Sequence, residues 1–220
     1  MDSISNNKTS KIRKTIHLIR HGQTDFNLRN IIQGSGVNSD LNATGIQQAQ
    51  LFFENYGHLN YNHIYTSQLN RAIQSVQLFI DKPLPHTKLE GLNEINWGIM
   101  EGKESTPERH KEYERIIAEW TNGNLNIAIE GGETPEALYQ RQKVALHHIL
   151  EQPLEEELIL ICMHGRAMRS FLCLLTGISL SEMEKWPHHN LCLYELSYNG
   201  KTFDLIIEND IRHLGKGVTF

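Results

Sequence analysis

Apolar and polar residues follow two different periods along this chain, and their succession predicts an α/β fold. Apolar runs of strand length occupy residues 15–20, 63–67 and 157–164. The last run, ELILICMH, is apolar enough for a central strand that is buried on both faces. Helical spacing occurs at residues 44–56, 68–80, 107–121, 135–151 and 166–176. Because strands and helices take turns, we expect a mostly parallel central sheet flanked by helices.

Local signals indicate where several of these elements begin and end. Thr134 followed by Pro135 is typical of a helix start, and Gly177 is typical of a helix end. A short extended segment is expected around residues 87–89. Near the C-terminus, two strand-like runs flank Asn199–Gly200, which is a strong signal for a hairpin turn. The sheet should therefore end in an antiparallel hairpin.

Composition limits the classes of protein to which the chain can belong. Its 220 residues, 39% of them hydrophobic and 21% charged, predict one folded domain over residues 13–220, preceded by a disordered polar tail at 1–12. The net charge of −5, without a basic face, argues against nucleic acid as a partner. No apolar run approaches the ~18 residues of a membrane span, and no signal peptide is visible.

Three cysteines in apolar surroundings show no metal-ligand spacing and are expected to be buried free thiols: Cys162, Cys173 and Cys192. Free thiols are typical of a reducing compartment. We therefore expect a cytoplasmic protein. We also expect a monomer or a homodimer that binds neither nucleic acid nor membrane.

Polar side chains that carry chemistry follow three of the predicted strands. Arg20 and His21 come directly after the first strand, residues 67–71 after the second, and His164 closes the most apolar one. The carboxyl ends of parallel strands meet at one edge of a sheet, where ligands bind. Two histidines and two arginines in one crevice suit a phosphate monoester, which carries roughly −1.5 to −2 charges near neutral pH.

The order of several motifs adds a family resemblance. The motifs are LIRHGQTDFN (18–27), QG (33–34), LNATGIQQA (41–49), YTSQLNRAIQS (65–75), LNEINWGIMEG (92–102) and CMHG (162–165). In this order the chain resembles the histidine phosphatase superfamily, in the branch that contains phosphoglycerate mutases, fructose-bisphosphatases and ribazole phosphatases. The resemblance runs from about Thr15 to Leu196. It implies a phosphoglycerate mutase-like fold with a small helical cap insertion at residues 103–130.

The resemblance also implies roles for seven residues: His21 as the nucleophile that becomes phosphorylated, Glu94 as the proton donor and later acceptor, and Arg20, Asn27, Gln33, Arg71 and His164 as the residues that hold the phosphate. The chemistry agrees with these roles. A neutral imidazole, with a reference pKa of about 6.5, is a competent nucleophile at pH 7, and neighbouring arginines keep it neutral. Neither a metal nor a cofactor is expected, because side chains supply the positive charges.

Some assignments remain open at the level of sequence. Glu90 and Glu101 are close to Glu94 and compete for the role of acid. Arg166 is predicted to be a surface residue at a helix start, although it could touch the substrate. Two histidine pairs, 147–148 and 188–189, suggest metal ligands, but adjacent helical residues point about 100° apart. We therefore predict surface or helix-cap histidines and no zinc site.

The choice between phosphatase and mutase depends on the segment between Gly102 and Gly131. The mutases of this family carry paired arginines there, whereas this chain has only isolated Arg109 and Arg115, nearly balanced by acidic residues. We therefore predict a phosphomonoesterase acting on a small phosphorylated metabolite, with residues 103–130 forming the cap that sets specificity. The alternatives are a cofactor-dependent phosphoglycerate mutase and a non-catalytic phospho-ligand binding module. A binding module would be expected to have lost the nucleophile or the acid.

Overall fold

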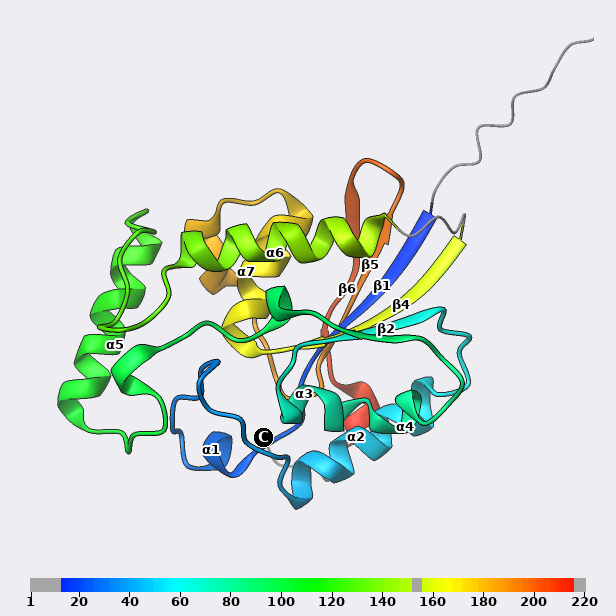
Figure 1. Cartoon of the computed structure of the whole chain (residues 1–220), viewed down its shortest axis with the longest axis horizontal. Coiled ribbons are helices and arrows are strands. Elements are labelled where there is room, and N and C mark those ends of the chain that lie inside the picture. The colour runs from blue at the N-terminus through cyan, green and yellow to red at the C-terminus, as the bar shows by residue number, and fades with distance from the viewer. Residues whose placement is uncertain (1–12, 152–155, 216–220) are drawn as a thin grey trace, which may run out of the picture.

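A six-stranded sheet with the strand order β3-β2-β4-β1-β5-β6 forms the centre of the molecule (Figure 1). The computed structural model describes residues 13–151 and 156–215, so the tail expected at 1–12 lies outside it. The strands are β1 (Arg13–Arg20), β2 (His63–Thr66), β3 (His86–Lys88), β4 (Glu156–Met163), β5 (Leu193–Tyr198) and β6 (Phe203–Asp210). The first four are parallel to one another, β5 is antiparallel to β1, and β6 is antiparallel to β5. The expected mostly parallel sheet with a terminal hairpin is confirmed.

Helices cover both faces of this sheet (Figure 1). They are α1 (Asp25–Leu28), α2 (Ala43–Tyr56), α3 (Asn70–Ser75), α4 (Gln77–Ile80), α5 (Pro107–Thr121), α6 (Pro135–Leu150) and α7 (Gly165–Thr176). One core cluster joins the sheet to α6 and α7, and the other joins it to α2, α3 and α4. Short 3₁₀ turns lie in the connections between β3 and α5 and between α7 and β5, and another follows β6. The cluster beside α6 and α7 also includes residues of α5, so α5 extends this layer beyond the end of the sheet.

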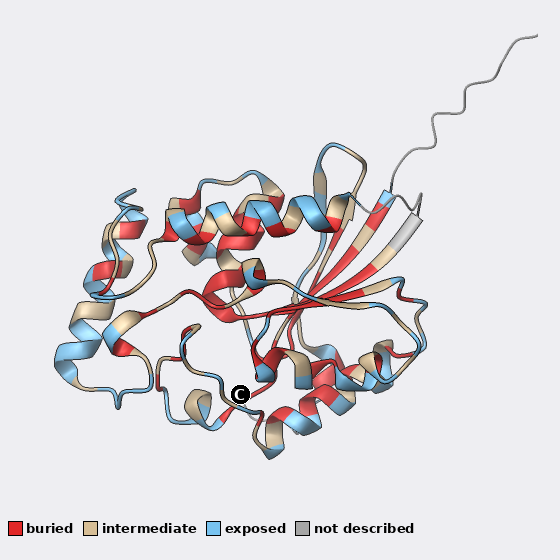
Figure 2. Ribbon diagram, in the orientation of Figure 1, coloured by how far each residue is buried: buried red, intermediate tan, exposed pale blue. Residues whose placement is uncertain are grey.

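The β4 strand shows why its sequence is apolar throughout. Ile159 and Ile161 point into the core beneath α6 and α7, whereas Leu160 and Cys162 point into the core beneath α2, α3 and α4. All four are fully buried, and the strand lies between β2 and β1 (Figure 2). The prediction of a central strand buried on both faces is confirmed.

The expected helix at residues 68–80 is instead two short helices, α3 and α4, separated at Val76. Val76 has a non-helical backbone (φ −122°, ψ 17°). The hydroxyl of Ser75 donates to the carbonyl of Arg71 at 2.6 Å and accepts the Gly22 amide at 2.8 Å. A serine that bonds back to the carbonyl four residues earlier tends to bend a helix. Here the same hydroxyl also anchors the loop after β1.

The local signals mark the element ends as predicted. The Thr134 hydroxyl accepts the amide of Ala137 at 3.1 Å and so caps α6. Gly177 ends α7 in the left-handed conformation (φ 71°). The side chain of Asn199 accepts the amides of Lys201 and Thr202 in the turn between β5 and β6.

The three cysteines are buried free thiols, as predicted. Within residues 13–151 and 156–215, no helix has the length and apolar character needed to cross a membrane.

Candidate active site

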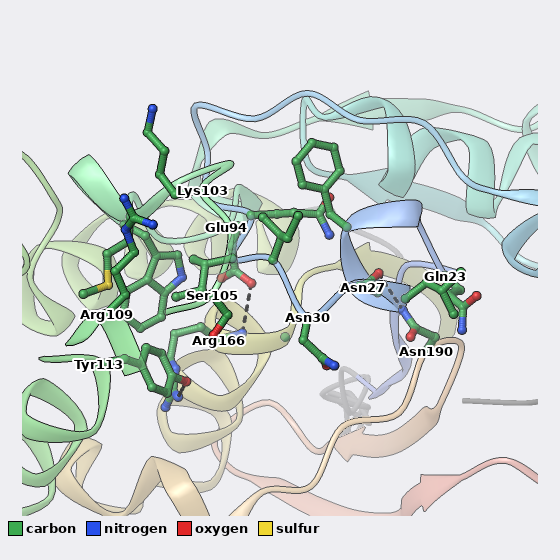
Figure 3. Close-up of a pocket in the computed structure, with 18 of the residues that line it drawn as sticks. Gln23, Asn27, Asn30, Glu94, Lys103, Ser105, Arg109, Tyr113, Arg166 and Asn190 are labelled. Carbon is green, nitrogen blue, oxygen red and sulfur yellow. Dashed lines mark hydrogen bonds between the residues drawn. The ribbon is translucent and has the colours of Figure 1, made fainter. Parts of the chain in front are cut away.

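A cavity of about 560 Å³ opens where β1 and β4 end (Figure 3). Its walls come from the segment after β1, from the loop around Trp97, from α5, from the start of α7 and from residues 188–190. Five of the seven predicted site residues line it: Arg20, His21, Asn27, Gln33 and Glu94. The other two, Arg71 and His164, are fully buried, and the His164 ring lies 5.1 Å from the His21 ring, centroid to centroid. The structure therefore brings all seven to one end of the sheet.

His21 is held as a neutral imidazole in one tautomer. Its Nδ1 lies 2.7 Å from the carbonyl oxygen of Gly22. Because a carbonyl only accepts, Nδ1 carries the proton and Nε2 keeps its lone pair. Burial, followed by the charges of Arg71 and Arg20, holds the pKa of His21 well below its ordinary value. The ring is therefore a neutral base with its nucleophilic nitrogen available at pH 7.

The glycine after His21 is required by a close backbone approach. A Cβ atom on Gly22 would lie 2.8 Å from the carbonyl oxygen of Gly45 in α2. The His21 amide also donates to the carbonyl of Met163 at 3.0 Å, which extends the pairing of β1 with β4 beyond the strand end. These contacts fix the backbone on both sides of the imidazole.

Arg71, His164 and Ser67 form a directed chain of hydrogen bonds. Nε of Arg71 lies 3.1 Å from Nδ1 of His164, and an arginine only donates. His164 therefore carries its proton on Nε2, which lies 2.7 Å from the Ser67 hydroxyl oxygen. Burial, and then the charges of Arg71 and His21, hold the pKa of His164 well below its ordinary value. His164 is thus a neutral link between β2, α3 and α7.

Two further donors of Arg71 hold the loop that precedes α2. Nη1 donates to the carbonyl of Val37 at 2.6 Å, and Nη2 donates to the carbonyl of Gly34 at 3.2 Å. Together with the bond to His164, three of the five N–H groups of the guanidinium are used. Each terminal nitrogen keeps one further N–H group.

Glu94 is fixed by backbone amides at the start of α7. Its Oε1 accepts the amides of Ile95 at 2.9 Å and Ala167 at 2.7 Å, and its Oε2 accepts the amide of Arg166 at 3.0 Å (Figure 3). A carboxylate is well placed at the amino end of a helix, where amides lack partners. Of the three carboxylates that the sequence offers as the acid, Glu94 lines the cavity and Glu90 and Glu101 do not.

Asn27 and Gln33 are organised around Thr24, which sequence reasoning missed. The Thr24 hydroxyl caps α1 by accepting the Asn27 amide at 3.2 Å, and the Thr24 amide donates to Oδ1 of Asn27 at 3.1 Å. Nε2 of Gln33 donates to the same hydroxyl at 2.8 Å. A threonine followed three residues later by a side chain that can accept a hydrogen bond is typical of a helix start.

Arg166 is not the surface residue that was expected. It is only 6% exposed, it lines the cavity, and its Nη2 donates to the hydroxyl of Tyr113 in α5 at 2.9 Å. Its guanidinium also pairs with Glu184 and lies over the ring of Trp97, 5.8 Å from the ring centre. The prediction is wrong because α5 packs over the start of α7 and covers the side chain.

The prediction for the second histidine pair is wrong for one member. His188 lines the cavity, where its Nδ1 and its carbonyl oxygen both accept hydrogen bonds from Nη1 of Arg20, at 3.2 and 3.1 Å. His189, His147 and His148 are exposed. In the part of the chain that the structure describes, no three His, Cys, Asp or Glu side chains cluster as metal ligands would.

The charges of the cap segment do not cancel at the cavity, contrary to the balance read from sequence. Lys103, Arg109 and His110 line the cavity, and Glu104 is the cap acid that does so; it pairs with Arg29. The other charged residues of the segment are not part of the lining: Glu108, Lys111, Glu112, Glu114, Arg115, Glu119 and Glu130. Within α5, the rotation of 3.6 residues per turn places Arg109 and His110 on the cavity side and turns the other charged side chains away from it. The mouth of the cavity is therefore cationic.

Known proteins resemble this chain over most of its length. A protein from Hydrogenobacter thermophilus with the provisional name phosphoserine phosphatase 2 is 28% identical over 91% of this chain and 97% of its own length. The provisionally named phosphoglycerate mutase GpmB of Yersinia pestis is 29% identical over 83% of this chain and 84% of its own.

Solved structures show the same architecture. YhfR of Bacillus stearothermophilus is 26% identical with a TM-score of 0.79, covering 91% of this chain and 99% of that one. The alpha-ribazole phosphatase of Shigella flexneri is 25% identical with a TM-score of 0.78, covering 89% and 96%. The family model of the histidine phosphatase superfamily, branch 1, matches residues 16–211. With the paired histidines and arginines at the ends of β1, β2 and β4, the chain belongs to the histidine phosphatase superfamily.

Proposed function

We propose that this protein is a phosphomonoesterase that hydrolyses a small phosphorylated metabolite through a phosphohistidine on His21. The observation that carries the proposal is the state of His21, a neutral imidazole whose Nδ1 proton is bound by Gly22. His21, whose Nε2 keeps its lone pair, lines the same cavity as Arg20 and Glu94. Relatives named as phosphatases, at 25–28% identity, support the same activity.

In the first half of the reaction, Nε2 of His21 attacks the phosphorus atom and the bond to the ester oxygen breaks. Positive side chains compensate the charge on the transferring group, which is most of what phosphoryl transfer requires. Arg20 and the two remaining N–H groups of Arg71 are the donors for the phosphate oxygens. Glu94 gives its proton to the departing alkoxide, so that the product leaves as an alcohol.

In the second half, water replaces the alcohol. The Glu94 carboxylate accepts a proton from that water, which attacks the phosphorus atom as the phosphorus–nitrogen bond breaks. The His21 ring recovers its lone pair, Glu94 is protonated again, and inorganic phosphate leaves. The hydrogen bond from Nδ1 to Gly22 keeps the same tautomer and ring orientation through both halves.

Access of water favours hydrolysis over transfer to a second substrate. The mouth of the cavity is lined by exposed residues of the α1 region and of the cap segment, among them Leu28, Lys103, Ser105 and Arg109. We propose that the cap, residues 103–130, sets specificity through the side chains that it places on the cavity. An exposed cationic mouth and the GpmB relative favour one alternative, a phosphoglycerate mutase. A non-catalytic binding module is disfavoured because His21 and Glu94 are both in place.

Three further expectations complete the proposal. The protein acts in the cytoplasm, as its free thiols suggested, and it is a monomer or a homodimer. It needs neither nucleic acid nor membrane as a partner. The cationic side chains at the phosphate end replace a metal cofactor, so hydrolysis should continue after dialysis against a chelator.

The test is to trap the intermediate. The protein is mixed briefly with a ³²P-labelled phosphate ester and denatured, and the labelled residue is identified by peptide mapping. We expect an acid-labile, base-stable label on His21 and none in His21→Ala. A label on another residue, or hydrolysis that survives His21→Ala at the wild-type rate, would overturn the proposal. A panel of sugar phosphates, phosphoglycerates, phosphoserine and nucleotides then identifies the substrate class.

A further inference from the structure

His188 contacts the cavity at a position that the catalytic steps above do not use. Its ring lies against the first residue of α7: a Cβ atom on Gly165 would come within 3.0 Å of Cε1 of His188 and 3.3 Å of both ring nitrogens. Real Cβ atoms rarely approach so closely, so the glycine makes room for this ring. The ring therefore occupies a fixed place between Arg20 and the start of α7.

The segment that carries His188 is tied to the same strand end that carries the nucleophile. The side chain of Asn190 donates to the carbonyl of His21 at 2.9 Å, and the amide of Leu191 donates to the carbonyl of Arg20 at 3.0 Å. On its other side, Nε of Arg169 donates to the carbonyl of Trp186 at 2.8 Å. The backbone around His188 thus keeps a constant distance from Arg20 and His21.

Arg20 meets His188 through one nitrogen only. Nη1 donates both to Nδ1 and to the carbonyl oxygen of His188, while Nε of Arg20 is buried without a hydrogen-bond partner among the described residues. Holding an arginine by one terminal nitrogen fixes the plane of its guanidinium. The remaining donors then stay available for a planar, two-point contact with phosphate oxygens.

The chemical nature of the acceptor matters as much as its position. Because arginine only donates, Nδ1 of His188 must hold a lone pair, so its ring is neutral. Burial, followed by the charges of Arg20, Arg169 and Arg166, lowers the pKa of His188 to about 2. Glu184, the carboxylate of this cluster, pairs with Arg166 and Arg169. A carboxylate at position 188 would instead cancel the charge of Arg20.

From this arrangement we infer that His188 is a positioning residue that orients Arg20 through an uncharged acceptor and thereby leaves the full positive charge of Arg20 to the substrate phosphate. The inference rests on the proposed function, since it assigns His188 to the phosphate end of the same site. His188 acts through Arg20 and takes no part in proton transfer.

Three substitutions separate orientation from charge. His188→Ala removes the side-chain acceptor, His188→Asn restores an uncharged acceptor, and His188→Asp restores an acceptor with a negative charge. The exposed neighbour supplies the matched control, His189→Ala. For each variant, kcat and KM are measured with p-nitrophenyl phosphate, the affinity for inorganic phosphate is measured by calorimetry, and Tm is recorded without ligand.

We expect His188→Ala to lose about tenfold or more in kcat/KM and in phosphate affinity, as for a lost hydrogen bond to a charged group. His188→Asn should recover most of both. His188→Asp should fall below His188→Asn in phosphate affinity although its Tm is no lower. Equal phosphate affinity in His188→Asn and His188→Asp would overturn the inference, and so would wild-type values in His188→Ala.

A double-mutant cycle tests whether His188 acts through Arg20. In an Arg20→Ala background, adding His188→Ala should leave the phosphate affinity unchanged, and independent, additive losses would contradict the inference. The binding measurement does not need turnover. If wild-type protein hydrolysed no ester but bound phosphate in this His188-dependent way, the proposed function would fail and the inference would stand.

Discussion

Nε of Arg71 donates a hydrogen bond to Nδ1 of His164 across 3.1 Å, and this contact fixes the tautomer of His164. It makes His164 a donor toward Ser67, so a positive charge, a neutral ring and a hydroxyl follow one another in a fixed direction. All three side chains are fully buried. The end of the cavity at His21 is therefore supported by the layer of Arg71, His164 and Ser67, which cannot rearrange without leaving polar atoms unpaired.

Arg71→Lys should show how much of this layer depends on the guanidinium. One ammonium group cannot reach His164, the carbonyls of Gly34 and Val37 and a phosphate together. We expect inhibition by inorganic phosphate to weaken by about tenfold or more, and the free energy of unfolding to fall by about 1–3 kcal/mol for each buried acceptor left unpaired. Enzyme kinetics and chemical denaturation measure the two effects.

The matched control for this substitution is Arg115→Lys on the exposed face of α5, where Arg115 pairs with Glu112. It should leave both phosphate inhibition and stability near the wild-type values. If Arg71→Lys destabilised the protein but kept wild-type phosphate inhibition, Arg71 would be a structural residue and not part of the phosphate pocket.

Glu94→Gln should slow substrates according to their leaving groups. Alkyl phosphates need a proton on the departing oxygen, so we expect their kcat to fall by roughly 10²–10⁴-fold. With p-nitrophenyl phosphate, whose phenolate leaves without a proton, the rate of the first half of the reaction should fall much less. Burst kinetics separate that half from the attack of water. Equal losses of the first-half rate on both substrates would mean that Glu94 positions the substrate and that another group is the acid.

Glu94→Gln also has a predicted cost in stability. In Glu94→Gln an amide nitrogen, which cannot accept, takes the place of one carboxylate oxygen: either Oε1, which accepts the amides of Ile95 and Ala167, or Oε2, which accepts the amide of Arg166. We expect a loss of about 1–3 kcal/mol in the free energy of unfolding, measured with urea. An unchanged stability would contradict the carboxylate contacts at the start of α7.

Stability should fall in acid because several neutral histidines cannot take up protons in the folded state. The pKa values of His21, His164 and His188 are all lowered by burial and by nearby arginines. Below the unfolded value of about 6.5, the unfolded chain binds protons that the folded chain does not, so stability decreases as the pH falls. Each group contributes a slope of up to about 1.4 kcal/mol per pH unit.

The measurement is a comparison of urea unfolding for wild type and His188→Asn between pH 7 and pH 4. The variant lacks one of these histidines, so the difference between the two proteins should change with pH below about 6.5, down to the folded value of about 2. The other ionisable groups cancel in this difference. Parallel curves across the whole range would mean that His188 titrates in the folded protein as it does in the unfolded chain.

Hydrolysis and mutase activity can be distinguished directly. Both would start from phosphohistidine, and they differ in whether water or a bound phosphoglycerate attacks it. Since exposed side chains line the cavity mouth and admit water, release of phosphate should exceed interconversion of 2- and 3-phosphoglycerate by at least roughly tenfold, even with 2,3-bisphosphoglycerate present. Quantitative ³¹P NMR follows both reactions in one sample.

Lys103→Ala is informative within the same assay. Lys103 is exposed at the mouth, and it should affect the KM of substrates that carry a second negative charge more than the KM of p-nitrophenyl phosphate. Rapid interconversion that depends on Lys103 would show that the cationic mouth serves a mutase, while the chemistry assigned to His21 would remain.

The amino-acid sequence by itself determined the elements, the strand ends and most of the residues at the phosphate end. Local periodicity decides whether a segment is a strand or a helix, and consecutive residues such as Arg20 and His21 remain neighbours in any fold. Caps such as Thr134 depend on contacts three residues away. These features follow from short-range sterics and hydrogen bonding, so a linear pattern records them.

Only the tertiary structure decided which other charged residues reach the cavity. His188 meets Arg20 from 168 positions away, and Arg166 meets Tyr113 from 53 positions away. The hydroxyl of Ser75, beside the break at Val76, accepts the amide of Gly22 from 53 positions away. Whether a polar side chain is solvated or buried depends on which element packs over it, and that choice is made by the whole core. A local pattern of charges therefore identified the chemistry of the site but not the orientation of Arg20 or the positive charge at the cavity mouth.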